Sequence, residues 1–314
     1  MMLLAWNATS GRGPGVALLF GTGLVGSSVA TALSRITGAI PRHMSWSWED
    51  DGAQDAAVLE RAAVEALGAR PDAGLAVIWA AGRSGFGTDD AGMAREAATL
   101  DAVLACARRV LMATPERQAV LHHVSSAGGL FEGQVACGPE AAPNPFRPYG
   151  TGKLDQECKV KDVEAFDRCR IYRPSSVYGY SRRGRRGLIP VLIDAALRRY
   201  PARIVGALMT QRDYVHADDV GLHIAARVLN PGPEPTATEL LAQARPASIF
   251  EILQLVETEV GLPVLRQLDP RPDNARDNTF LRAALAPGFR AMPLAEGIAR
   301  TALALARDHK AAAS

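Results

Sequence analysis

The sequence lacks long apolar runs and lacks a charge excess. No uncharged apolar stretch approaches the roughly 18 residues that a membrane-spanning helix needs. The 35 lysines and arginines are nearly balanced by 33 aspartates and glutamates, which leaves a net charge of +2. A balance of this kind gives no reason to expect nucleic-acid or membrane partners. Since 48% of the 314 residues are hydrophobic, we expect a globular cytoplasmic protein with a sizeable core.

Cysteines are also few, and their spacing excludes two classes of site. The four lie at Cys106, Cys137, Cys158 and Cys169, with no C-x-x-C pair among them. This spacing is typical of reduced thiols rather than of a disulfide framework or a zinc site. We therefore predict no metal.

The first 15 residues lack the basic lead and the long apolar stretch of a secretory signal. Their sequence, "MMLLAWNATSGRGPG", begins with apolar residues and ends in glycine and proline. We expect residues 1–15 to form a flexible leader.

Beyond the leader, short apolar runs alternate with helical patterns. Strands are predicted near 16–20, 75–81, 119–127 and 168–176, and helices near 54–68, 91–110, 151–166 and 188–199. Alternation of this kind predicts an α/β fold, a Rossmann-type doubly wound parallel sheet with a smaller C-terminal substrate-binding domain. We assign 16–173 and about 204–229 to the dinucleotide-binding domain, and 174–203 and 230–314 to the substrate-binding domain.

A glycine turn follows the first of these strands. Gly21, Gly23 and Gly26 form a G-x-G-x-x-G pattern that opens a helix. Such a turn lets the backbone approach a pyrophosphate at the helix N-terminus, although a ligand-free turn has the same composition. Its place directly after a strand favours a dinucleotide.

The sequence does not identify which residue would contact the adenosine ribose. About 20 positions past the glycines, Arg42 and His43 would favour a 2′-phosphate, whereas Glu49 would favour a free hydroxyl. The predicted cofactor is therefore NAD or NADP.

Two further patterns bear on catalysis. The pair Tyr149 and Lys153 has the spacing of one helical turn, and Ser125 and Ser126 end a predicted strand. Alone, Tyr-x-x-x-Lys occurs by chance and Ser-Ser is a common turn. Their order behind the glycine turn makes them candidates for an acid–base centre.

In that order, the glycine turn, the serines and the Tyr–Lys pair resemble the short-chain dehydrogenases/reductases. "RPSSVYG" (173–179), "RDYVHADDVG" (212–221) and the segment from "RPDNARDNTF" onward resemble the extended branch, the NAD-dependent epimerase/dehydratase family acting on nucleotide sugars. The resemblance runs from about residue 16 to about residue 303. It implies an NAD(P)-dependent nucleotide-sugar epimerase, most simply at C4, and a homodimer formed through the helix that bears Tyr149.

The resemblance assigns roles to single positions. Tyr149 would be the general acid/base, Lys153 would supply positive charge, and Ser126 would bond the reacting oxygen, with Ala127 as the other alignment. The implied cofactor contacts are Gly21, Gly23, Leu24, Val25, Gly26, Ala80, Ala81, Ser125, Tyr149, Lys153, Arg173 and Pro174. The implied substrate contacts are Ser126, Ser176, Arg212 and Arg271.

Two departures from the family pattern keep alternatives open. Phe20 stands where the family has an additional glycine, and Glu96 aligns with an asparagine. Ala127 and Gly128 follow Ser126 where 4,6-dehydratases have an Asp-Glu pair, which disfavours dehydration. The alternatives are a keto-sugar reductase using NADPH and a cofactor-binding protein with altered catalysis.

Two other clusters have plainer interpretations. Next to His216, Asp218 or Asp219 is expected to cap a helix rather than bind metal. The arginines of "SRRGRRG" (181–187) lack interleaved aromatics, so they indicate a loop over an anionic substrate or a solvated loop.

Overall fold

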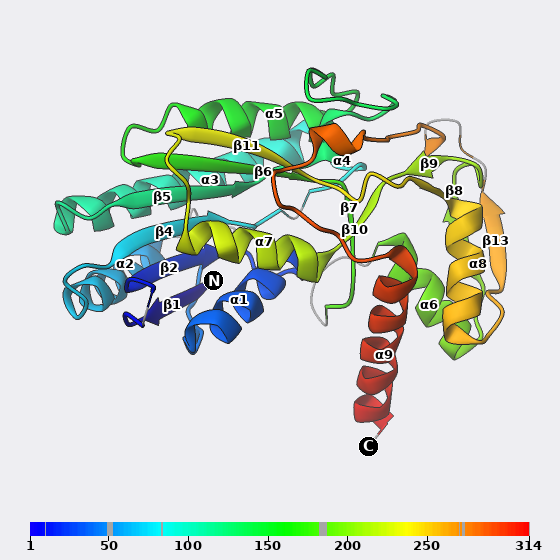
Figure 1. Ribbon diagram of the computed structural model, residues 1–314, viewed down its shortest axis with the longest axis horizontal. Coiled ribbons are helices and arrows are strands. Elements are labelled where there is room, and N and C mark those ends of the chain that lie inside the picture. The colour runs from blue at the N-terminus through cyan, green and yellow to red at the C-terminus, as the bar shows by residue number, and fades with distance from the viewer. Residues whose placement is uncertain are drawn as a thin grey trace.

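A mostly parallel sheet forms the centre of the molecule (Figure 1). The computed structural model describes residues 1–9, 11–48, 53–82, 84–181, 187–269, 271 and 274–313. Seven strands lie in the order β11-β6-β5-β4-β2-β1-β3. Their bounds are β1 Met2–Trp6, β2 Gly15–Phe20, β3 Arg42–His43, β4 Gly74–Trp79, β5 Ala119–Val124, β6 Arg168–Pro174 and β11 Thr236–Leu241. The strands β2, β4, β5, β6 and β11 are parallel.

Helices cover both faces of this sheet. One face carries α1 (Leu24–Thr37) and α7 (Ala217–Leu229). The other face carries α2 (Ala53–Gly68), α3 (Asp90–Ala113) and α5 (Pro148–Lys161). Local signals set the ends of these helices: Asp89 caps α3 by accepting from the Gly92 N–H, and Gly38 ends α1 with a left-handed φ of 74°. The predicted doubly wound α/β fold is confirmed.

The prediction of a flexible leader is wrong for residues 2–6. They form β1, which runs antiparallel to β2 and pairs Met2 with Leu19 and Trp6 with Gly15. Leu4 is fully buried, so this segment belongs to the core. β1 separates β2 from β3, which pairs with β1 alone. Because β1 is paired on both sides, its apolar side chains pack into the layers on the two faces of the sheet.

A smaller lobe is built from segments that alternate along the chain with the last elements of the main sheet. Its helices α6 (Leu188–Arg198), α8 (Ile249–Val260) and α9 (Leu294–Ala313) share one apolar core. Three short strand pairs accompany these helices: β7 Ser176–Tyr178 with β10 Tyr214–His216, β8 Ala202–Val205 with β13 Arg266–Asp269, and β9 Gln211–Arg212 with β12 Ala247–Ser248. Two further helices are very short, the α-helix α4 (Ala127–Leu130) and the 3-10 helix η2 (Arg282–Ala284). The division differs from the prediction at β11, which joins the main sheet, and the predicted boundary near residue 204 falls within β8.

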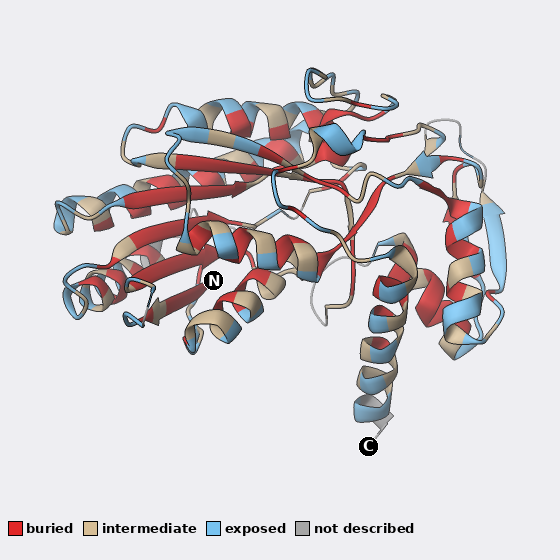
Figure 2. Ribbon diagram, in the orientation of Figure 1, coloured by how far each residue is buried: buried red, intermediate tan, exposed pale blue. Residues whose placement is uncertain are grey.

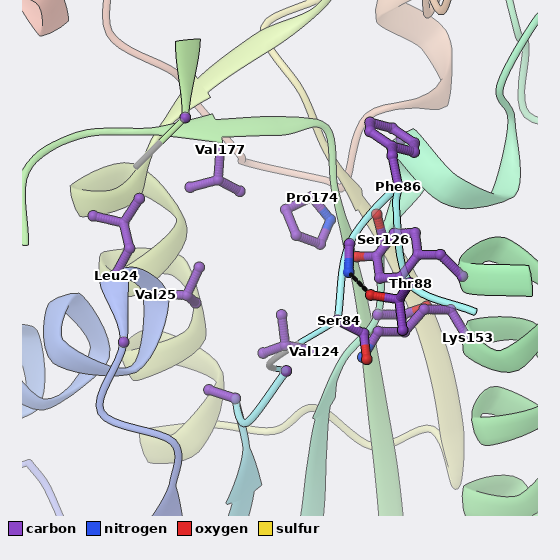
Figure 3. Close-up of a pocket in the computed structure, with 18 of the residues that line it drawn as sticks. Leu24, Val25, Ser84, Phe86, Thr88, Val124, Ser126, Lys153, Pro174 and Val177 are labelled. Carbon is purple, nitrogen blue, oxygen red and sulfur yellow. Dashed lines mark hydrogen bonds between the residues drawn. The ribbon is translucent and has the colours of Figure 1, made fainter. Parts of the chain in front are cut away.

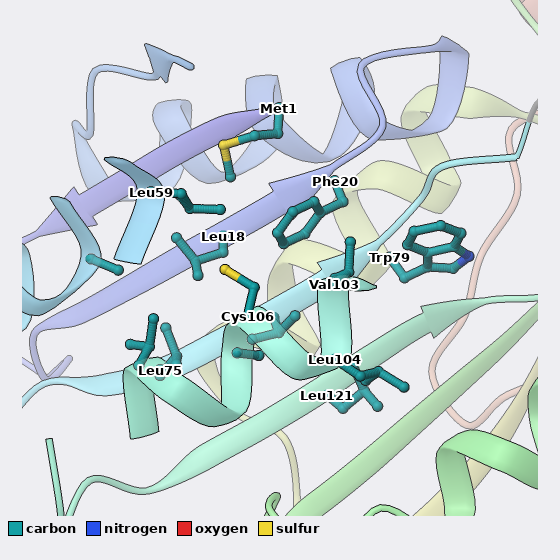
Figure 4. Close-up of a cluster of buried hydrophobic side chains, with 14 of the residues drawn as sticks. Met1, Leu18, Phe20, Leu59, Leu75, Trp79, Val103, Leu104, Cys106 and Leu121 are labelled. Carbon is teal, nitrogen blue, oxygen red and sulfur yellow. The ribbon is translucent and has the colours of Figure 1, made fainter. Parts of the chain in front are cut away.

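Burial follows this division into layers (Figure 2). All six residues of β2 are buried, as the near-continuous apolar strands of a covered parallel sheet require. On the α2–α3 face, Met1, Phe20 and Leu59 pack in one cluster (Figure 4). No helix in the described part of the chain is both long and apolar enough to cross a membrane.

Candidate active site

The glycine turn has the geometry that a bound pyrophosphate requires. Gly21 has φ of 95°, and a Cβ there would lie 2.4 Å from the carbonyl carbon of Ala80. A Cβ on Gly26 would lie 1.9 Å from the carbonyl oxygen of Gly21. A Cβ on Gly23, in contrast, would meet nothing within 4 Å. Gly21 and Gly26 thus permit the turn and the packing of α1, while Gly23 leaves its backbone open to a ligand.

A cleft of about 1540 Å³ begins at this turn and continues along the carboxyl ends of the strands toward the smaller lobe. It is large enough for a dinucleotide together with a second ligand. Every predicted cofactor contact lines it except Gly26 and Arg173. Ser126, Ser176 and Arg212 line it as well, whereas Arg271 does not. Figure 3 shows Leu24 and Val25 at one end and Ser126 and Lys153 at the other.

Tyr149 and Lys153 lie in the first turns of α5. Pro148 opens this helix, which suits proline because the first helical N–H needs no partner. Tyr149 is half-buried and Lys153 is 4% exposed. Both line the cleft, as the spacing of one helical turn requires.

Ser126 is placed by the short helix α4. Its Oγ caps α4 by accepting a hydrogen bond of 3.1 Å from the Gly129 N–H. Because this bond uses a lone pair, the hydroxyl proton stays available for donation to a ligand. Ala127, the other alignment for this position, is fully buried and does not line the cleft. Ser125 lines the cleft beside Ser126, with its buried Oγ lacking a protein partner.

A buried carboxylate contacts Lys153. The Lys153 Nζ donates to Glu96 Oε1 over 2.7 Å and to Gln156 Oε1 over 3.2 Å. Burial would raise the pKa of the Glu96 carboxyl, but the Lys153 charge and the hydrogen bonds from Lys153, Ser84 and Gln156 together lower it. Glu96 is therefore ionised at neutral pH. The cleft thus holds a carboxylate and an ammonium in direct contact.

Phe86 was missed by the sequence analysis. Its ring lies edge-on to Tyr149, with 5.9 Å between the ring centroids, and the Arg212 Cζ lies 5.0 Å from its centroid. The only signal in the sequence was its position in the loop after a strand, where open sheets place their ligands. Phe86 connects the predicted acid/base with the predicted substrate arginine.

Two predicted arginines have partners elsewhere. Arg173 makes a bidentate ion pair with the fully buried Glu157 of α5, at 2.9 Å and 2.6 Å. Arg271 is 59% exposed and lies 3.4 Å from Asp269. In this structure Arg173 therefore ties α5 to β6, and Arg271 lies outside the cleft.

The first departure from the family pattern, Phe20, is a core residue. Its ring packs edge-on against Trp46, with 5.0 Å between centroids, on the α2–α3 face. It is fully buried and does not line the cleft. Phe20 therefore leaves the glycine turn open.

The adenosine end of the cleft differs from the prediction. Because β1 stands between β2 and β3, Arg42 and His43 lie one strand farther from the glycine turn, and neither lines the cleft. Met1 and Trp48 line it there instead. Glu49 and the arginines at 182–186 lie outside the described residues.

The expected helix cap at 218 or 219 is wrong. The His216 side chain caps α7 by accepting from the Asp218 N–H over 3.2 Å. The Asp219 carboxylate instead accepts from the Met292 N–H over 2.8 Å. Among the residues that the structure describes, no group of three or more His, Cys, Asp and Glu side chains gathers as a metal site would.

The sequence profile of the NAD dependent epimerase/dehydratase family matches residues 18–235. Among curated relatives, the UDP-glucose 4-epimerase of Mycolicibacterium smegmatis is 30% identical over 193 residues, which are 57% of this chain and 60% of that protein. The uncharacterized protein y4nG of Sinorhizobium fredii is 30% identical over 119 residues, 37% of this chain and 28% of that protein. The chain thus spans less than two thirds of the length of either relative.

Solved structures share the fold. The UDP-glucose 4-epimerase of Bifidobacterium longum, in complex with NAD⁺ and UDP, superposes with a TM-score of 0.68 at 19% identity, covering 89% of this chain and 87% of that one. The Stenotrophomonas maltophila UDP-glucose-4-epimerase, with bound NAD and formylated UDP-arabinopyranose, gives 0.66 at 22% identity, covering 91% and 88%.

Proposed function

The chain belongs to the NAD dependent epimerase/dehydratase family, and we propose that it is a nucleotide-sugar epimerase that inverts the C4 hydroxyl. The family makes it an NAD-dependent enzyme of the extended short-chain dehydrogenase/reductase type. One observation carries the proposal: Tyr149, Lys153 and Ser126 line the same cleft as the glycine turn.

The glycine turn and the start of α1 would hold the pyrophosphate of NAD. Gly23 leaves room for it, and the first turn of α1 contains no acidic side chain to repel it. Held there, NAD would supply the reversible hydride chemistry of the reaction. Because the cofactor would end each turnover in the state in which it began, the protein would have no need to release it.

Tyr149 would move the proton. A phenol ionises near pH 10, so a base at neutral pH needs a positive charge nearby, and Lys153 supplies one from the same helix. As phenolate, Tyr149 would take the proton of the C4 hydroxyl and give it back after the keto-sugar has turned over in the cleft. Ser126 would donate its free hydroxyl proton to the same sugar oxygen.

Arg212 would bind the diphosphate at the other end of the substrate. A guanidinium fork matches phosphate oxygens, and the Phe86 ring under Arg212 limits how the guanidinium moves. Dehydration is disfavoured because it needs a second acid/base pair after Ser126. Ala127 and Gly128 occupy those positions, and both are buried.

The experiment compares wild type with Tyr149→Phe on UDP-glucose and its C4 epimer, followed by NMR, with mass spectrometry of the bound nucleotide. Wild type should interconvert the two sugars without net change of the cofactor. Tyr149→Phe should retain NAD and lose on the order of 100-fold or more in rate. Wild-type turnover by Tyr149→Phe would refute the mechanism, and net consumption of NADPH would identify a reductase instead.

The assembly expected is a homodimer through α5. The exposed positions of α5 include Thr151, Asp155, Cys158 and Lys161, so a contact through this face would be largely polar. Solution mass measurement tests this, and a monomer at all concentrations would exclude it.

A further inference from the structure

Glu96 and Lys153 form an ion pair that bridges two helices inside the cleft. Glu96 comes from α3 and Lys153 from α5, 57 residues later. Their side chains are 6% and 5% exposed, so water screens the pair little. The 2.7 Å contact is that of a charge-assisted hydrogen bond. The pair is thus a built feature of the site and not a surface contact.

The hydrogen bonds around this pair leave little freedom to the ammonium. Lysine has three N–H donors, and Glu96 and Gln156 each take one. The Gln156 amide also donates to Glu96 Oε1 over 3.1 Å, which closes a triangle. The second carboxylate oxygen accepts from the Ser84 N–H over 3.3 Å. One N–H of Lys153 remains for the ribose or the phenol.

This arrangement has an electrostatic consequence for Tyr149. A lysine assists a neighbouring phenol through its net positive charge, and a carboxylate in contact with that lysine cancels much of the field. This cancellation weakens the assistance that Lys153 can give to the phenol.

We propose that Glu96 is a positioning residue that fixes the Lys153 ammonium and sets the pH at which Tyr149 becomes a base. The inference rests on the proposed acid–base role of Tyr149.

The other charged side chains around Tyr149 and Lys153 are arginines, and none of them supplies the negative charge that Glu96 places beside Lys153. Arg147 precedes Tyr149, but its charge is matched by Glu132 at 2.9 Å. Arg212 approaches from β9 across the Phe86 ring. On α3, Arg95 lies at the rim of the cleft, where it is exposed.

His123 of β5 is fully buried, and the charge of Lys153 acts on it. Burial, together with the Lys153 charge, holds the pKa of His123 well below its ordinary value, so it carries no charge at neutral pH. His123 therefore adds no charge beside the ammonium, whereas the Glu96 carboxylate contacts it directly.

The test is a spectroscopic titration of tyrosinate absorbance in NAD-saturated protein, where each variant is compared with its own Tyr149→Phe partner. Glu96→Gln should move the Tyr149 midpoint down by about one pH unit, because an anion is lost near the phenol. Gln156→Glu adds an anion to the same ammonium and should move it up. An unchanged midpoint, or shifts of the opposite sign, would overturn the proposal.

Asp101→Asn provides the matched control. Asp101 also joins α3 to α5, through Lys159 at 2.7 Å, but this pair is 54% and 39% exposed and does not line the cleft. The control should leave the midpoint in place, and an equal shift in it would contradict the proposal. Should Glu96→Gln not fold, Gln156→Glu still decides the sign. The titration uses no substrate, so failure of epimerisation and failure of this inference are read separately.

Discussion

The carbonyl oxygen of Gly129 lies 2.3 Å from the point where a Cβ on Gly150 would stand, so α4 and α5 meet through bare backbone. A Cβ on Gly129 would itself lie 2.8 Å from a ring carbon of Tyr149. These two glycines therefore seat the tyrosine against the helix that Ser126 caps. Glycine disfavours a helix by up to about 1 kcal/mol, and here that cost permits the close approach.

Gly150→Ala should separate α4 from α5 and displace Tyr149. Overpacking of this kind costs about 1–3 kcal/mol, and we expect turnover to fall at least about tenfold because catalytic geometry tolerates little displacement. Thermal unfolding and steady-state rates measure the two effects. The exposed neighbour Thr151→Ala is the control and should leave both close to wild type. A fully active, stable Gly150→Ala protein would contradict the role given to this contact.

Gly23→Ala and Gly26→Ala should fail in different ways. The Gly26 Cβ would overlap the Gly21 carbonyl oxygen at 1.9 Å, so this variant should unfold more readily. A Cβ on Gly23 would meet nothing within 4 Å, so this variant should fold normally and bind NAD at least about tenfold more weakly. Calorimetry of unfolding and of NAD binding separates them. Unchanged affinity in Gly23→Ala would place the pyrophosphate elsewhere.

Leu4→Ala should destabilise the protein by about 2–5 kcal/mol, because it leaves a cavity in the core. Leu4 is fully buried in β1, in the segment whose sequence suggests a leader. Leu222→Ala is the matched control, since Leu222 is 55% exposed on α7 and its loss should change the free energy of unfolding by less than about 0.5 kcal/mol. Equal small effects from both would mean that β1 is not part of the folded core.

The two buried histidines of β5 should make the protein acid-sensitive. Burial lowers the pKa of His122 to about 3, and that of His123 lies well below its ordinary value of 6.5. Below pH 6.5 the unfolded chain binds protons that the folded chain does not. The free energy of unfolding therefore decreases as the pH is lowered. For His122 this loss continues down to about pH 3.

His123→Leu should remove one of these contributions. The free energy of unfolding, from denaturant titrations between pH 6 and 4, should fall less steeply than in wild type, by about 1.4 kcal/mol per pH unit. The difference between variant and wild type should be constant above pH 7, where both states of the histidine are neutral. Parallel acid slopes would mean that His123 is protonated in the folded protein.

The sequence was sufficient for features that depend on neighbours along the chain. The apolar runs of β2, β4, β5 and β6 can be recognised because a covered parallel strand buries nearly every side chain. Tyr149 and Lys153 fall on one face because a helix repeats every 3.6 residues. Gly21 and Gly26 are forced by backbone geometry within a single turn.

Features that depend on pairing between distant segments could not be predicted in this way. The run at 2–6 looks like a leader until β2 and β3 offer it edges to pair with. The sequence led us to expect a ligand contact from both Arg173 and Arg212. Only the packing shows that Arg173 pairs with Glu157, whereas Arg212 lies beside Phe86.

The sequence by itself determined the sheet strands β2, β4, β5 and β6, the glycine turn and the Tyr149–Lys153 pair, since local periodicity and steric limits act within a few residues. Only the tertiary structure decided that Glu96 meets Lys153, because these residues lie 57 positions apart and their two helices must first pack on one sheet. The depth at which they pack removes water and turns an ordinary pair of charges into a strong interaction.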